Sequence, residues 1–123
     1  MLAAVGREAK AIARSPSALL VTDTNVAEHY LEPVSASLRA AGLAAETVAL
    51  PPGEASKTLE TAGRLYDRML GAGLDRGSVV VGLGGGVMTD LAGFVAATYM
   101  RGVSWVAVST SLLGQVDASV GGK

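Results

Sequence analysis

The segment VVVGLGGGVMTDLAGF, Val79–Phe94, decides the fold of this chain because three consecutive glycines join one apolar run to another. The first run has no alternating polar residues, which is typical of a strand buried on both faces of a sheet. The second run is apolar on nearly every side and predicts a buried helix over Val87–Met100. Three adjacent glycines are costly in backbone entropy, so their position indicates that some group approaches the main chain closely.

Strands and helices alternate outward from this segment in both directions. Strands are predicted at Ser17–Asp23, Ala45–Pro51, Ser78–Gly84 and Gly102–Ser109. Further helices are predicted at Leu2–Ala13, Val26–Ala41 and Lys57–Leu70. The tail TSLLGQVDASVGGK, residues 110–123, starts like a helix and ends in glycines. This order predicts an α/β fold, a Rossmann-like parallel sheet flanked by helices.

Composition narrows the class of protein further. The chain has 123 residues, which suits one domain, and half of them are hydrophobic. A net charge of −1 without a basic block argues against nucleic acid or an anionic membrane as partner. No cysteine is present, so disulfides and thiolate metal sites are excluded. Because no apolar run reaches the roughly 18 residues of a membrane span, and the N-terminus lacks a signal-peptide core, we expect a cytoplasmic protein.

The glycine loop has two readings. In open parallel sheets ligands bind beyond the carboxyl ends of the strands, and bare amides at a helix N-terminus attract anions such as a pyrophosphate. The usual dinucleotide fingerprint fails, because Val87 stands at its third glycine position and no acid follows about 20 residues later. No Gly-Lys-Ser/Thr follows either, so the loop is not a P-loop. The alternative is that the glycines only allow tight helix–strand packing.

The roles of three charged or titratable residues can also be considered from their positions in the sequence. Asp90 is either a first-turn carboxylate stabilised by the helix dipole or a ligand contact within an apolar helix. Arg101 lies roughly 16 Å further along that helix, too far for an ion pair with Asp90, and is expected to cap the helix C-terminus. His29, the only histidine, is expected near the surface without a metal role, and no His, Asp and Glu cluster has metal-ligand spacing.

Four stretches resemble one family. The segments GLGGGVMTDLAGFVAATYMRG (82–102) and STSLLGQVDASVGGK (109–123) closely resemble 3-dehydroquinate synthases, and VTDTNV (21–26) and PPGEASK (51–57) match upstream signatures in the expected order. The resemblance covers Ala18–Lys123. It implies a two-domain enzyme with an N-terminal NAD-binding α/β domain and a helical C-terminal domain. Residues 1–123 are then interpreted as a truncated NAD-binding domain whose helical partner domain is absent.

The resemblance also implies a reaction. Family members convert 3-deoxy-D-arabino-heptulosonate 7-phosphate, a phosphorylated sugar acid, into 3-dehydroquinate and phosphate in the shikimate pathway of aromatic amino acid biosynthesis. NAD oxidises one hydroxyl of the substrate and is regenerated, while a divalent metal, zinc or cobalt, polarises that hydroxyl. The metal ligands, a Glu and two His, lie downstream of the matched stretch in the family. We therefore expect no metal site in this chain and no activity from it alone.

Site residues follow from the same resemblance. Asp23 and Asn25 are expected near the adenosine ribose, the glycine loop at the pyrophosphate, Asp90 near the nicotinamide, and hydroxyls of Thr110 and Ser111 on the cofactor. The implied cofactor-binding residues are Asp23, Asn25, Glu54, Lys57, Gly84, Gly85, Gly86, Val87, Asp90, Thr110, Ser111, Asp117 and Lys123. The implied substrate-binding residues are Arg101, Asp117 and Lys123, with Arg101 holding the phosphate across a homodimer.

The chain departs from the family pattern at one loop, and other classes of protein are alternatives to this resemblance. The family has Pro-Thr-Thr where this chain has Ser109-Thr110-Ser111, so the loop loses a proline but keeps its hydroxyls. Related sugar-phosphate cyclases of the valiolone or deoxy-inosose type share the glycine loop. Metal-dependent polyol dehydrogenases have a similar plan but carry a lysine where Gly93 stands here. A non-catalytic folding or dimerisation module that does not bind NAD is the remaining alternative. Because half of a two-domain enzyme should expose the apolar surface on which its partner domain docks, we also expect oligomerisation or poor solubility.

Overall fold

The computed structural model describes residues 2–110 and 116–121, with only the backbone given for residues 3 and 116–121. Five helical segments and five strands follow one another, together with a single turn of 3-10 helix after α4. They are α1 (Ala3–Ile12), β1 (Ser17–Asp23), α2 (Thr24–Ala40), β2 (Ala44–Leu50), η1 (Glu54–Ser56), α3 (Leu59–Gly71), β3 (Val79–Gly84), α4 (Gly86–Thr98), η2 (Tyr99–Arg101), β4 (Ser104–Thr110) and β5 (Val116–Gly121). The predicted elements are confirmed to within about two residues at each boundary.

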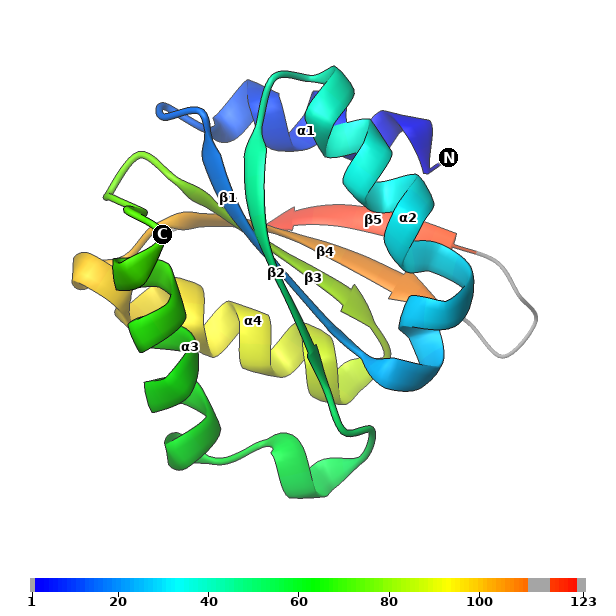
Figure 1. Ribbon diagram of the computed structural model, residues 1–123, viewed down its shortest axis with the longest axis vertical. Helices are drawn as coiled ribbons and strands as arrows, with labels where there is room; N and C mark the ends of the chain where they lie inside the picture. The colour runs from blue at the N-terminus through cyan, green and yellow to red at the C-terminus, as the bar shows by residue number, and fades with distance from the viewer. Residues whose placement is uncertain (1, 111–115, 122–123) are drawn as a thin grey trace.

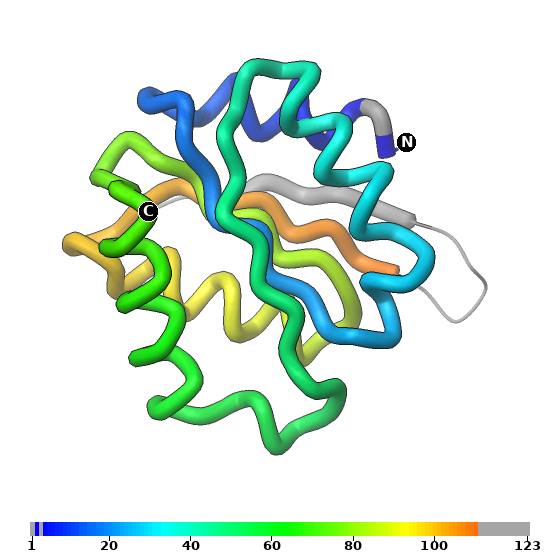
Figure 2. Tube along the Cα trace, in the orientation of Figure 1, coloured from blue at the N-terminus to red at the C-terminus, as the bar shows by residue number. Residues whose placement is uncertain are grey.

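One twisted sheet forms the centre of the molecule, with strand order β2-β1-β3-β4-β5. Strands β1 to β4 are parallel, as predicted, and each is connected to the next by a crossover helix, α2 on one face of the sheet and α3 and α4 on the other (Figure 2). The fifth strand differs from the prediction, because β5 pairs antiparallel with β4 at the edge. The helix expected at the start of the tail falls on residues 111–115, outside the described residues.

Helices cover both faces of the sheet in two layers, α1 with α2 on one face and α3 with α4 on the other (Figure 1). Because β-strand side chains alternate, β1 sends Leu19 and Val21 toward α3 and α4, and Ala18 and Leu20 toward α1 and α2. All four side chains are fully buried. The apolar run of β1 is therefore explained by burial on both faces.

Close packing of α4 on the sheet depends on glycine. A Cβ at Gly82 would lie 2.5 Å from the Cβ of Ala92 on α4, so only hydrogen fits between strand and helix there. Farther along the helix, a Cβ at Gly93 would lie 3.0 Å from the indole ring of Trp105 on β4. These two glycines let the helix lie directly on β3 and β4.

The amino ends of the strands are tied together by short hydrogen bonds. The hydroxyl of Ser15 donates to Asp75 Oδ1 at 2.5 Å, and the amide of Gly77 donates to the same oxygen at 2.9 Å. Ser17 begins β1 and Ser78 directly precedes β3. Their hydroxyls share a hydrogen bond of 2.6 Å. The hydrogen bonds that Asp75 accepts, first from the Ser15 hydroxyl and then from the Gly77 amide, lower the pKa of its carboxyl below the usual value.

Candidate functional site

The sequence-predicted cofactor residues meet at the carboxyl edge of the sheet. Register aligns Asp23 with Leu50, places Thr22 beside Leu83, and aligns Gly84 with Ser109, so the ends of four parallel strands form one row. The predicted residues lie at or just after the ends of these strands: Asn25 after β1, Glu54 and Lys57 after β2, the glycines at the end of β3 and start of α4, and Thr110 at the end of β4. Strands far apart in the sequence thus bring these residues to one edge, where open α/β sheets bind ligands.

The three consecutive glycines have different environments. Gly84 is buried with φ +145°, and a Cβ there would lie 3.2 Å from Met88, so both backbone conformation and packing require glycine. Gly85 and Gly86 are exposed, and a Cβ built on either meets no atom within 4 Å. Packing therefore explains Gly84 but leaves the other two unexplained.

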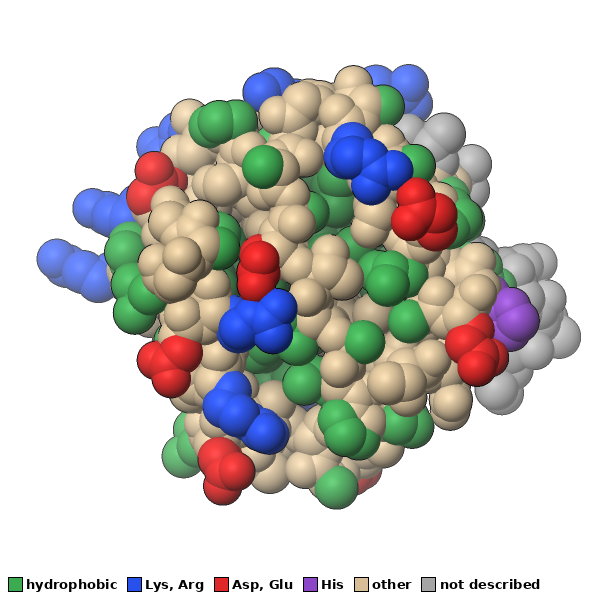
Figure 3. All heavy atoms as spheres, in the orientation of Figure 1, with side chains coloured by type: hydrophobic (Ala, Val, Ile, Leu, Met, Phe, Trp, Pro, Cys, Tyr) green, Lys and Arg blue, Asp and Glu red, His purple; other side chains and the backbone are tan. Residues whose placement is uncertain are grey.

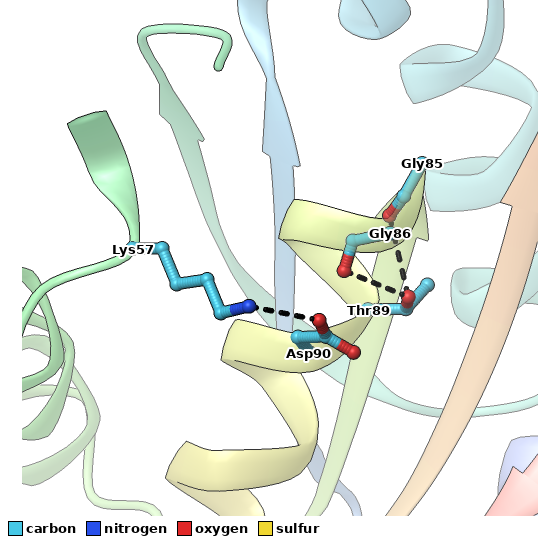
Figure 4. Close-up of polar contacts among 5 residues, drawn as sticks. All are labelled: Lys57, Gly85, Gly86, Thr89 and Asp90. Carbon is cyan, nitrogen blue, oxygen red and sulfur yellow. Dashed lines mark hydrogen bonds and ion pairs between the residues drawn. The ribbon is translucent and has the colours of Figure 1, made fainter. Parts of the chain in front are cut away.

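The first turn of α4 begins at these exposed glycines. Gly85 is the N-cap residue and has no side chain to accept from the first amides, which lack carbonyl partners within a helix. The hydroxyl of Thr89 donates to the carbonyls of Gly85 and Gly86 at 3.3 and 3.2 Å, so these contacts use the carbonyl oxygens of the two glycines and not their N–H groups (Figure 4). An exposed helix N-terminus with open space above bare backbone suits an anionic group such as a pyrophosphate.

Lys57 and Asp90, 33 residues apart in the sequence, form an ion pair beside the glycine loop. Lys57 Nζ reaches from the loop before α3 to Asp90 Oδ2 on α4 at 3.1 Å (Figure 4). This hydrogen bond and the charges of Asp90 and Glu54 raise the pKa of Lys57 above its usual value. The pair borders a groove of about 220 Å³, whose other lining residues are Thr58, Leu59, Leu91 and Phe94. Asp90 is exposed on α4, so its charge is not buried among the apolar residues of that helix.

Asp23 connects the start of α2 with the glycine loop. Its Oδ1 accepts from the amide of Val26 at 2.8 Å, which makes Asp23 the N-cap of α2. Its Oδ2 lies 3.7 Å from the position that a Cβ of Gly84 would occupy. Sequence reasoning placed Asp23 near the ribose but missed the capping role, although an Asp directly before a helical pattern is a standard N-terminal signal.

The remaining predicted residues are placed as follows. Asn25 is exposed in the first turn of α2, Glu54 is exposed in η1, Val87 is half-buried in the first turn of α4, and Thr110 is half-buried at the end of β4. The backbone of Asp117 lies beside Ser109 in the antiparallel pair, which puts β5 into the same row as Gly84. Ser111 and Lys123 lie outside the described residues.

Arg101 does not join this group. It lies in η2 after the C-terminal end of α4, at the amino edge of the sheet, and its side chain is exposed. Met100 and Arg101 both have left-handed φ angles, +46° and +70°, so the helical spacing used to place Arg101 does not extend to it. Within one copy of the chain, α4 separates Arg101 from the glycine loop by its whole length.

The described part of the chain lacks two kinds of feature. No group of three or more His, Asp and Glu side chains there could hold a metal ion. No helix in residues 2–110 has the length and apolar character that a bilayer crossing requires.

The fold and the open glycine turn define a class: a Rossmann-like α/β domain, with its candidate site at the carboxyl edge of a parallel sheet. Residues 47–123 match the family model described as 3-dehydroquinate synthase N-terminal. The chain therefore belongs to the 3-dehydroquinate synthase family. A 3-dehydroquinate synthase of Symbiobacterium thermophilum is 58% identical over 106 residues, which cover 86% of this chain and 30% of the relative. The chain thus spans about a third of the length of such relatives.

Solved structures agree on the fold. A valiolone synthase (ValA, 2-epi-5-epi-valiolone synthase) from Streptomyces hygroscopicus subsp. jinggangensis, with NAD⁺ and Zn²⁺ bound, is 31% identical with a TM-score of 0.68, covering 80% of this chain and 28% of that one. A 2-deoxy-scyllo-inosose synthase complexed with carbaglucose-6-phosphate, NAD⁺ and Co²⁺ is 24% identical with a TM-score of 0.74, covering 80% and 27%. Iron-containing and other alcohol dehydrogenases share the fold as well.

Proposed function

We propose that this chain is the NAD-binding part of a cytoplasmic 3-dehydroquinate synthase that forms 3-dehydroquinate from 3-deoxy-D-arabino-heptulosonate 7-phosphate with release of phosphate. Membership of the family supports the reaction, and the related cyclases whose structures hold NAD⁺ support the cofactor. The observation in this molecule that carries the proposal is the open turn at Gly85 and Gly86, at the start of α4 and on the carboxyl edge of the sheet.

In this proposal, different residues at the carboxyl edge of the sheet bind different parts of the cofactor. The first-turn amides of α4 bind the diphosphate, because unpaired N–H groups and the helix dipole both favour negative charge. Asp23 holds the adenosine ribose through the carboxylate oxygen that does not cap α2. Lys57 and Asp90 flank the groove beside the glycine loop and orient the part of the dinucleotide beyond the diphosphate. Bound NAD supplies reversible hydride transfer at a substrate hydroxyl.

The substrate is proposed to be a phosphorylated sugar acid, with Asp117, Lys123 and Arg101 as binding residues. Arg101 lies at the opposite edge of the sheet from the glycine loop, so an Arg101 that contacts the substrate phosphate must serve a site in a second copy. We therefore propose a homodimer as the working assembly. The divalent metal belongs to residues outside this stretch, and we expect no phosphate release from the 123-residue chain alone.

The family match favours 3-dehydroquinate synthase over the valiolone and deoxy-inosose cyclases, which share the fold. The position of Gly93 argues against a polyol dehydrogenase, because a side chain there would meet the ring of Trp105. Comparing the full-length protein on the seven-carbon acid phosphate and on cyclase sugar phosphates tests this choice. Product formation from another sugar phosphate, without 3-dehydroquinate from the acid, would contradict it.

Calorimetric titration with NAD⁺ tests the cofactor site directly. We expect Gly86→Val to weaken NAD⁺ binding at least about tenfold, because a branched side chain would fill the space above the first-turn amides. Gly63→Val is the matched control: Gly63 is also helical, with no atom within 4 Å of a Cβ position, but it lies on α3 away from the loop. Absence of NAD⁺ binding to the unmodified chain, or equal binding by Gly86→Val, would overturn the proposed site.

A further inference from the structure

The N–H groups at the start of α4 belong to its most pliable residues. Gly85 and Gly86 are exposed, and a Cβ built on either meets no atom within 4 Å. Glycine adopts more backbone conformations than any other residue, so the peptide groups of these two residues need a contact from elsewhere to keep one orientation.

The orientation of these peptide groups matters because charge contributes little at the turn. The chain has a net charge of −1, and on the face shown in Figure 3 the blue and red side chains are interspersed. Lys57, beside the turn, is already paired with Asp90 at 3.1 Å. An anion at the turn is therefore attracted chiefly by N–H groups and the helix dipole, and the strength of that attraction depends on their direction.

Thr89 supplies the contacts that the two glycines need. Its hydroxyl donates to the carbonyls of Gly85 and Gly86, and its backbone amide donates to the Gly85 carbonyl at 3.1 Å (Figure 4). A threonine in a helix can place its hydroxyl on the carbonyls three and four residues earlier. The side chain and backbone of this one residue thus converge on both carbonyls of the turn.

Holding a carbonyl also fixes an N–H group. A peptide group is planar and trans, so the carbonyl of Gly85 and the N–H of Gly86 point in opposite directions within one rigid unit. The carbonyl of Gly86 and the N–H of Val87 form the next unit. Because Thr89 holds both carbonyls toward the body of the helix, both N–H groups are directed away from it. Amides at these first helical positions have no carbonyl partner within the helix.

Thr89 is itself anchored on the sheet. A Cβ at Gly82 of β3 would lie 3.5 Å from the Cα of Thr89 and 3.3 Å from the carbonyl oxygen of Met88. Helix α4 is buried only on this side, which corrects the prediction of a buried helix, since Phe94 and Ala97 are exposed. Thr89 therefore connects the exposed turn to the part of α4 that the sheet holds in place.

We propose that Thr89 is a positioning residue for the cofactor site, whose hydroxyl holds the N–H groups of Gly86 and Val87 in the direction that the diphosphate requires. The proposal rests on the proposed function, because it concerns the amides assigned there to the diphosphate. Thr89 acts through the two glycine carbonyls. A site whose donors are already oriented loses less conformational freedom on binding, so it binds more tightly.

Calorimetric titration with NAD⁺ tests the effect on affinity. Thr89→Val keeps the shape of the side chain without the hydroxyl, and we expect the dissociation constant to rise roughly threefold to tenfold, as for the loss of one hydrogen bond. Thr89→Ser keeps the hydroxyl and should restore the affinity. Thr98→Val is the matched control: the Thr98 hydroxyl donates to the carbonyls of Phe94 and Val95 at the same spacing, but at the far end of α4. It should leave NAD⁺ affinity unchanged.

Backbone order parameters from NMR relaxation test the physical cause. We expect the order of the Gly86 and Val87 amides to fall in Thr89→Val, to return in Thr89→Ser and to stay unchanged in Thr98→Val. A general loss of packing would not single out these two amides, so the measurement separates positioning from a merely structural contribution.

The outcomes distinguish this proposal from the proposed function. If the unmodified chain does not bind NAD⁺, the proposed cofactor site is wrong, and the assignment of Thr89 to it fails with it. If the unmodified chain binds NAD⁺ and Thr89→Val binds it equally well, the assignment of Thr89 alone is refuted. A loss of affinity that Thr89→Ser does not recover would refute it too, because the hydroxyl would then not be the cause.

Discussion

The two ends of the parallel sheet are built in opposite ways. At the amino end, side chains satisfy the hydrogen-bonding groups of the loops. Asp75 accepts from Ser15 and Gly77, and the buried hydroxyl of Tyr99 donates to the carbonyl of Leu74 at 2.7 Å. At the carboxyl end, Gly85 and Gly86 lie open, and one exposed ion pair, Lys57–Asp90, joins the neighbouring loops. Stability is concentrated at the end whose polar groups are satisfied, and ligand capacity at the end whose groups are left free.

Gly82→Val should lower the free energy of unfolding most, because it disrupts the packing of α4 on β3 between the two ends of the sheet. A Cβ at this position already falls 2.5 Å from Ala92, so the helix must move off the strand. We expect a loss of about 3 kcal/mol in the free energy of unfolding, measured in urea. Gly85→Ala, with open space around it, should change stability little. Equal losses for both variants would remove the distinction between packing and open glycines.

Tyr99→Phe removes one hydrogen bond from the saturated end. Tyr99 is almost fully buried, so the carbonyl of Leu74 would lose its partner where water has little access. We expect a loss of about 1–2 kcal/mol in the free energy of unfolding. NAD⁺ affinity should remain that of the unmodified chain, since the change lies at the opposite edge. A stability equal to that of the unmodified chain would show that water replaces the tyrosine.

Asp23 lies at the open end but also caps a helix, so its two functions can be separated. Asp23→Ala should cost about 1 kcal/mol of stability by removing the N-cap of α2, and it should also weaken NAD⁺ binding. Asp23→Asn keeps a capping oxygen and should retain stability, yet it loses the charge next to the ribose. Unfolding in urea and NAD⁺ titration on both variants separate the effects. Full NAD⁺ affinity in Asp23→Ala would exclude Asp23 from the site.

Asp75 makes the saturated end sensitive to acid. Its pKa is lowered in the folded protein, so its contribution to stability is present above the unfolded value of 3.8 and is lost as pH falls through the folded value. The urea midpoint should therefore decline on acidification from about pH 5, and Asp75→Asn should flatten part of that decline. An unchanged profile in Asp75→Asn would assign the acid sensitivity to other carboxyl groups.

The smallest effect on stability should come from Lys57, through its titration at alkaline pH. Its pKa is raised in the folded protein, so its contribution is present below 10.5 and is lost as pH rises through the folded value. Because the ion pair is exposed, we expect only a slight fall in urea midpoint there, absent in Lys57→Met and reduced by salt. A fall as large as the acid effect would contradict the contrast between the two ends.

The sequence was sufficient to predict the four parallel strands, because their apolar runs and the helical spacing between them are local signals. The fifth strand was missed, although Val116, Ala118 and Val120 alternate with Asp117 and Ser119, as in a half-buried strand. Leu59 and Leu70 share the helical spacing of the buried Leu65, but the sheet covers a narrower stripe of α3 and leaves both exposed.

The sequence predicted the glycine loop of the candidate site but not the contacts between distant residues there, and the reason is physical. A glycine run and a resemblance can be read from consecutive residues, so the loop was found. The Lys57–Asp90 pair joins residues 33 positions apart, and only the crossing of β2, α3 and β3 brings them together. Likewise, the left-handed angles of Met100 and Arg101 redirect the chain after α4, which helical spacing does not anticipate. Local patterns specify elements, whereas the contacts between them require the topology.

The contact between Gly93 and Trp105 also gives the molecule an optical probe of its own. Trp105 is the only tryptophan, and its indole lies against the backbone of α4, the helix whose first turn forms the open glycine site. Any ligand or second copy that shifts α4 on the sheet changes the surroundings of that one fluorophore. Emission from the unlabelled chain thus reports motion of the helix whose first turn forms the proposed cofactor site.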